Sequence, residues 1–128
     1  MTIRIVRLGT KRNKDEGLRL GTVRRPPRGI PKSEFAAQNW YDVWLPNVAP
    51  SPELMRLGKN AKSDKEWAVF VRKYRAEMAD PEKRRILDLL AALSHDTNLS
   101  VGCYCKNEVR CHRSVIRELL AERGAKLK

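Results

Sequence analysis

The sequence has no long apolar segment, few aromatic residues and few cysteines. No apolar run approaches the roughly 20 residues that a membrane-spanning helix needs, and the first residues lack the apolar core of a secretory signal peptide. We therefore expect a cytoplasmic protein with no membrane partner. The three cysteines are an odd number, which does not suit a paired disulfide framework. Reduced thiols are expected instead.

Acidic residues are also scarce relative to basic ones. The 128 residues include 27 Lys and Arg against 15 Asp and Glu, a net charge of +12. The first 32 residues hold ten basic residues against two acidic ones, which gives that segment a net charge of +8. Clustered cations attract phosphate groups and release counterions from nucleic acid. The same charge would equally suit a solvated face that keeps a small protein soluble.

The hydrophobic pattern predicts three strands. Residues 2–9 and 18–24 alternate in polarity and contain β-branched side chains, which is typical of strands. Residues 98–104 are short and apolar, as an inner strand would be. Between them, two adjacent prolines and Gly29 interrupt regular structure, so residues 25–50 are expected to be extended or irregular.

Helix-start signals predict three helices before the last strand and one after it. Ser51 precedes a proline, and Ser63 with Glu66 forms a capping box. Residues 81–94 carry an apolar stripe, and a final helix is expected to end at Gly124. A strand that returns after a helix indicates a βαβ crossover. We therefore expect residues 1–128 to form a single α/β domain with a small, at least partly parallel sheet flanked by helices.

The end of the sequence gathers every cysteine and one of the two histidines. Cys103 and Cys105 follow the last predicted strand, whereas Cys111, His112 and Arg113 fall at the start of the last helix. Ligands of open α/β sheets collect at the carboxyl ends of strands. A helix start offers N–H groups to an anion, and an arginine can clamp a phosphate through two parallel hydrogen bonds. The convergence predicts an anion site.

Other chemistries fit the same cluster less well. Zinc sites usually pair ligands two to four residues apart, and Cys111 and His112 would point about 100° apart on a helix. We therefore expect no metal and no cofactor. Six residues intervene between Cys103 and Arg110 and four between Cys105 and Arg110, whereas a phosphatase loop has five intervening residues. A redox pair would lack the usual two-residue gap.

Two further interpretations of the cluster stay open. Cys105 and Cys111 could approach each other as a redox pair if the intervening loop folds back. Alternatively, Cys103 and Cys105 are small buried hydrophobic residues, and His112 is a hydrogen-bonded loop anchor. Tyr74 lies on the apolar face of its helix, so we expect a core tyrosine with its hydroxyl bonded nearby.

Four segments resemble the prokaryotic domain of unknown function 488 (DUF488) family, in its YeaO-like branch. They are VRRPPRGIPK, WYDVWLPNVAPSPEL, VRKYRAEM and CYCKNEVRCHRSVIRELL, and together they cover most of the chain in order. The resemblance implies an α/β fold and names no reaction. The family motifs fall on Arg24, Pro27, Arg28, Gly29, Lys32, Pro50, Ser51, Leu54, Tyr74, Cys103, Cys111, His112, Arg113 and Ser114.

Three positions depart from the family pattern. Val23 stands where many members have an aspartate, and Pro26 stands where an aromatic residue is usual. Cys105 occupies a position that is acidic in many relatives, which weakens a three-cysteine metal site as a family feature. If the missing aspartate were the family's acid or base, this chain would lack it.

The residues and the resemblance together predict one pocket for a phosphate-bearing small molecule, such as a nucleotide. In this pocket His112 is the candidate acid or base and Cys111 the candidate nucleophile. A nucleic-acid-binding module without catalysis is the first alternative, and a cysteine–histidine metal or redox protein is the second. The candidate substrate-binding residues are Arg24, Arg28, Lys32, Arg113 and Ser114.

Overall fold

Four parallel strands form one sheet in the computed structural model, which describes all 128 residues. Strand β4 (Leu99–Cys103) lies between β1 (Ile3–Arg7) and β2 (Leu18–Gly21), and β3 (Val43–Trp44) lies at the edge beside β2. Every pairing is parallel. The last strand is therefore inserted between the first two, and the expected α/β fold with a parallel sheet is confirmed.

Four helices complete the fold, and the expected start signals begin two of them. Ser51 accepts a hydrogen bond from the N–H of Leu54, and Ser63 accepts one from the N–H of Glu66. Gly124, with φ of 77°, follows the end of the last helix as predicted. The helices are α1 (Pro52–Asn60), α2 (Asp64–Met78), α3 (Pro81–Leu93) and α4 (His112–Glu122).

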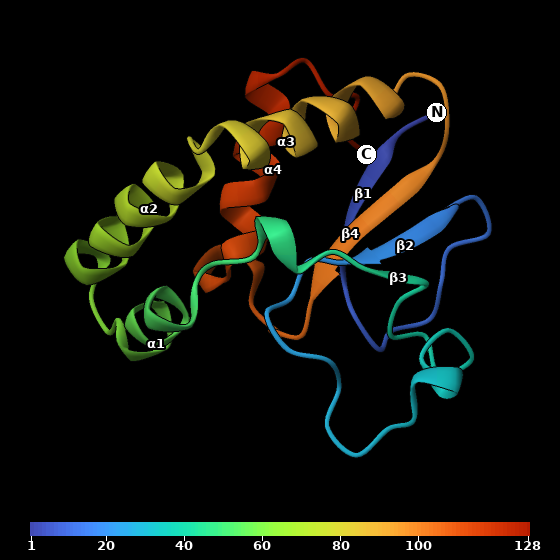
Figure 1. Ribbon diagram of the computed structural model, residues 1–128, viewed down its shortest axis with the longest axis horizontal. Coiled ribbons are helices and arrows are strands. Elements are labelled where there is room, and N and C mark those ends of the chain that lie inside the picture. The colour runs from blue at the N-terminus through green and yellow to red at the C-terminus, as the bar shows by residue number, and fades with distance from the viewer.

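Figure 1 shows the helices gathered to one side of the sheet, with the segment that joins β2 to β3 extending away from them. The main core contains 16 buried residues, contributed by the sheet and all four helices. A second cluster of five buried residues lies apart from it and consists of Leu8, Val23, Tyr41, Cys103 and Cys111. Two of the three cysteines are thus packed in a small core of their own.

The segment expected to be irregular contains one short strand. Backbone bonds from Asp42 to Arg19 and from Leu45 to Gly21 hold the two residues of β3 against β2. Tyr74 is fully buried and its hydroxyl donates to the Val48 carbonyl, so the prediction of a core tyrosine is confirmed. No helix combines the length and apolarity needed to cross a bilayer.

Candidate anion site at the carboxyl edge of the sheet

The predicted cysteine and histidine cluster forms where β4 ends and α4 begins. Cys103 is the last residue of β4, and Cys111 is the residue immediately before α4, in an extended conformation. Both are buried, whereas Cys105 is exposed. The Cys103 and Cys111 sulfurs and one ring nitrogen of His112 lie within 4.8 Å of one another. The loop between strand and helix therefore folds back and closes the cluster.

His112 is buried and held in one orientation. Its Nε2 lies 2.7 Å from the Thr22 carbonyl oxygen. Because a carbonyl only accepts hydrogen bonds, Nε2 must carry a proton, and the neutral ring keeps its lone pair on Nδ1. The Tyr74 ring packs edge-on at 6.0 Å between ring centroids. The imidazole is thus fixed with one nitrogen available.

The pKa values of Cys103 and Cys105 are shifted in opposite directions. Hydrogen bonds from the thiols of Cys103 and Cys111, with the positive charge of Arg113, lower the pKa of Cys105. The pKa of Cys103 is raised, first by its hydrogen bond to Cys105 and then by its bond to Cys111. A thiolate is the form of cysteine that acts as a nucleophile or binds a metal. The Cys105 thiol therefore ionises more readily than the Cys103 thiol.

Arg113 and Ser114 lie beside the cysteines. Arg113 is 4% exposed, its Nη2 lies 2.6 Å from the Cys105 carbonyl oxygen, and its buried Nε has no oxygen or nitrogen partner. The Ser114 hydroxyl donates to the Cys111 carbonyl at 2.8 Å, within the first turn of α4. Arg113 therefore faces the thiols, and Ser114 bonds to the backbone that carries them.

The predicted cations are distributed over neighbouring cavities. Arg24 lines a cavity of about 300 Å³ that also contains His112, here called the His112 cavity. Arg28 lines a larger cavity of about 790 Å³, here called the Trp40 cavity. Lys32 lines a different one, beside Phe35. The structure thus places Arg24 in the same cavity as His112, Arg28 in the Trp40 cavity and Lys32 in a separate cavity.

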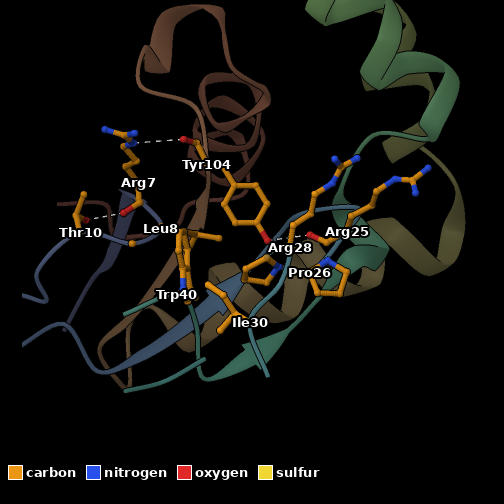
Figure 2. A pocket seen from close by; sticks show the side chains of 11 residues that line it. Arg7, Leu8, Thr10, Arg25, Pro26, Arg28, Ile30, Trp40 and Tyr104 are labelled. Carbon is orange, nitrogen blue, oxygen red and sulfur yellow. Dashed lines mark hydrogen bonds between the residues drawn. The ribbon is translucent and has the colours of Figure 1, made fainter. Parts of the chain in front are cut away.

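The Trp40 and His112 cavities adjoin, because Arg25 and Tyr104 line both. Figure 2 shows the Tyr104 side chain between Arg7 and Arg25, with its hydroxyl bonded to the Arg25 carbonyl at 2.8 Å. Trp40 packs edge-on against Tyr104 at 5.9 Å between centroids. Neither cavity is lined by an aspartate or glutamate. The joined space is therefore positively charged and partly aromatic.

Sequence reasoning missed two cations of this space. Arg25 follows Arg24 directly, and its exposure to the cavity depends on the backbone turn after β2. Arg56 reaches the His112 cavity from α1, two residues after the motif position Leu54. Only the packing of α1 beside the sheet edge places it there, so no sequence signal identifies it.

A phosphatase-type spacing was also missed: five residues separate Cys111 from Arg117. All five belong to α4, which begins directly after Cys111. Arg117 is ion-paired with Glu108 at 2.7 Å, and Cys111 is 1% exposed. Because a helix rather than an anion-cradling loop follows the cysteine, the structure still excludes a phosphatase loop.

Comparison with known proteins places the chain in a family. Residues 3–124 match the family model described as the active DUF488-N3 subclade. No curated protein and no solved structure matched the chain. The match spans nearly the whole α/β domain, including both strand ends that line the candidate site. On this evidence, the chain belongs to the DUF488 family.

Proposed function

We propose that the joined Trp40 and His112 cavities bind a phosphate-bearing small molecule of the nucleotide class. The observation that carries this proposal is the lining of the His112 cavity. Arg24, Arg25 and Arg56 come from two separate parts of the chain, share that cavity with His112, and have no carboxylate among them. Converging guanidinium groups without a carboxylate favour an anion and disfavour a hard metal cation.

The arginines are available to a ligand to different degrees. Arg24 is anchored by hydrogen bonds from Nε to the Pro50 carbonyl and from Nη2 to the Ala49 carbonyl, at 3.0 and 2.9 Å. This anchoring leaves Nη1 in a fixed position. Arg25 and Arg56 are exposed and form no ion pair within the chain. One oriented cation and two mobile ones suit a phosphate group.

The helix that begins at the site adds to this positive field. No side chain caps the amino end of α4, because Cys111 makes no capping hydrogen bond. The helix runs for 11 residues, so its amino end carries the usual partial positive charge. A phosphate near this end would be stabilised by the dipole as well as by the arginines.

The Trp40 cavity provides surfaces for the rest of a nucleotide. The rings of Trp40 and Tyr104 and the side chain of Ile30 line it, with Arg7 and Arg28 at its rim. Aromatic faces stack on any nucleobase. A volume of about 790 Å³ lies within the range of small-molecule sites. We place the base in this cavity and the phosphate beside Arg24 and Arg56.

Isothermal titration with a panel of nucleoside mono-, di- and triphosphates, and with inorganic phosphate, tests the proposal. Arg25→Ala and Arg56→Ala should each lower the affinity by about tenfold or more, since a hydrogen bond to a charged group contributes about 1.5–3 kcal/mol. Arg72→Ala is the matched control because Arg72 is exposed on α2 and lines no cavity. Absence of heat with every phosphate compound would overturn the proposal, as would equal losses in all three variants.

Single-stranded nucleic acid is a second candidate ligand, favoured by the Trp40 cavity alone. Arg7, Arg25 and Arg28 surround a pair of aromatic rings there, which is the combination that single-strand binders use. Fluorescence anisotropy with a labelled oligonucleotide at several salt concentrations would distinguish the two ligands. A polymer that contacts several cations loses affinity steeply with salt, whereas a mononucleotide loses much less.

A further inference from the structure

We propose that the cysteine and histidine cluster is a zinc site with Cys103, Cys111 and His112 as ligands and Cys105 in the fourth position. Tetrahedral zinc, with Zn–S bonds of about 2.3 Å, separates its ligand sulfurs by about 3.8 Å. The three buried ligand atoms already lie within 4.8 Å of one another. Closing them around an ion needs side-chain adjustments of about 1 Å.

The histidine is oriented as a metal ligand would be. A metal-bound histidine usually donates its other ring N–H to a backbone carbonyl or a carboxylate. His112 does this through Nε2 and the Thr22 carbonyl, which leaves the Nδ1 lone pair for the ion. This hydrogen bond is compatible with an ion bound at Nδ1. The ring therefore needs no reorientation to bind.

The fourth ligand is supplied by the exposed cysteine. Cys105 is the exposed thiol two residues after Cys103. It lines the His112 cavity and also a neighbouring cavity of about 350 Å³, which contains Cys111 as well. An ion can thus enter from solvent and be closed over by Cys105.

The charge of the cluster and the type of its ligand atoms favour zinc over other divalent ions. Three thiolates with a divalent ion carry one net negative charge, which the buried guanidinium of Arg113 balances. Its Nε, which has no oxygen or nitrogen partner, is free to donate to a ligand sulfur. Thiolates with one imidazole suit zinc, whereas magnesium and calcium prefer oxygen ligands. The donor set is therefore that of a Cys3His zinc site.

The sequence argument against zinc assumed that both Cys111 and His112 are helical. Cys111 instead precedes the helix, with φ of −125° and ψ of 149°. An extended residue followed by a helical one can direct both side chains to the same point, so the 100° separation does not apply. With an ion bound, Cys111 and His112 are ligands in place of the nucleophile and acid–base groups predicted from sequence.

Metal content and cobalt spectroscopy of the full chain test the proposal without any nucleotide. Protein purified under reducing conditions from zinc-supplemented cells should contain close to one zinc ion per chain. Replacement by Co²⁺ should give sulfur-to-cobalt charge transfer in the near ultraviolet and the intense visible bands of a tetrahedral site. Metal-free protein that also gives no cobalt spectrum would overturn the proposal. So would metal-free protein in which two thiols are lost to a disulfide.

Alkylation of wild-type protein tests the fourth ligand and avoids variants that fail to fold. Cys105 is exposed and should react readily in chelator-treated protein, while added zinc should slow its alkylation at least tenfold. Zinc binding with no protection of Cys105 would overturn its assignment. Among variants, His112→Ala should lose the metal. His95→Ala should retain it, because His95 lies at the opposite end of the fold and bonds to the Gly124 carbonyl.

Discussion

Strand β4 has a buried arginine beside each of its ends, and the two arginines are held in opposite ways. Near its start, Ser100 donates to Glu16, whose carboxylate accepts two hydrogen bonds from Arg19 at 2.6 and 2.9 Å. Arg19 uses its remaining nitrogen for two backbone carbonyls. Near the end of the strand, Arg113 makes one hydrogen bond to a carbonyl, and its Nε has no oxygen or nitrogen partner.

The difference separates a structural charge from one available to a ligand. A buried ion pair is tolerated when every donor and acceptor is satisfied, and the Glu16–Arg19 network meets that condition. Arg113 does not, because its Nε has no oxygen or nitrogen partner and the thiols of Cys103 and Cys111 influence it more than its carboxylate neighbour Glu108 does. A buried cation that faces thiols and lacks a full set of partners is suited to an added ion or anion. The buried charges near the amino end of the sheet are thus fully paired, whereas the buried guanidinium near its carboxyl end is not.

The largest expected loss of stability comes from removing the buried cation Arg19 near the amino end of the sheet. Arg19→Ala leaves the Glu16 carboxylate buried without its cation and removes the donors to two carbonyls. Removing one partner of a buried ion pair costs about 3–5 kcal/mol. Urea unfolding should show this loss in the free energy of unfolding.

A surface ion pair is the control for that measurement. Arg75 bonds to Glu118 and Glu122, which are both more than half exposed at 60% and 53%. Arg75→Ala should therefore cost only about 0–1 kcal/mol. Equal losses in the Arg19 and Arg75 variants would contradict the structural role given to the Glu16–Arg19 pair.

Low pH should reduce the stability that Glu16 contributes at the same end of the sheet. The pKa of Glu16 falls from 4.5 to about 2: burial opposes ionisation, but hydrogen bonds from Arg19 and Ser100 outweigh it. Because the folded pKa is lowered, the stabilisation is fully present above pH 4.5 and is lost as the pH falls through 2. A shift of this size corresponds to about 3 kcal/mol. Urea unfolding from pH 6 to pH 2 should show it.

Comparison with Glu16→Gln isolates this contribution from the other carboxylates. The variant cannot titrate at this position, so its stability should fall less steeply over the same pH range. Identical pH profiles for the variant and the parent protein would show that Glu16 is not the group responsible.

Local signals predicted much of the fold, because they depend on neighbouring residues. Ser51 and Ser63 mark helix starts, and the strand near residue 100 is mostly apolar. The order of strands was not predictable, since insertion of β4 between β1 and β2 is a long-range choice. Pairing of Val43 with Leu20 likewise depends on contacts between distant residues.

Charge counting overstated the basic character of the first 32 residues. Arg4, Arg12 and Arg19 each have a carboxylate partner, so they are not free for a ligand. The proposed anion site depends instead on Arg56, which lies on α1. It also depends on the loop that brings Cys111 close to Cys103. The sequence placed the cysteines near His112, and the structure brings Cys103, Cys111 and His112 together. The extended backbone of Cys111, on which the zinc proposal depends, could not be predicted from the sequence.

A smaller loss of stability than that of Arg19→Ala, but a more informative one, is expected at Arg113, beside the carboxyl end of β4. Arg113→Ala removes one hydrogen bond to a carbonyl, so it should cost about 1.5 kcal/mol, less than half of the Arg19→Ala loss. Loss of the balancing charge should weaken zinc binding by about tenfold to a hundredfold. Arg117→Ala on the same helix is the control, because Arg117 pairs with half-exposed Glu108. A large loss of stability with unchanged metal affinity would show that Arg113 has a structural role like that of Arg19. The two ends of β4 would then not differ in the way proposed.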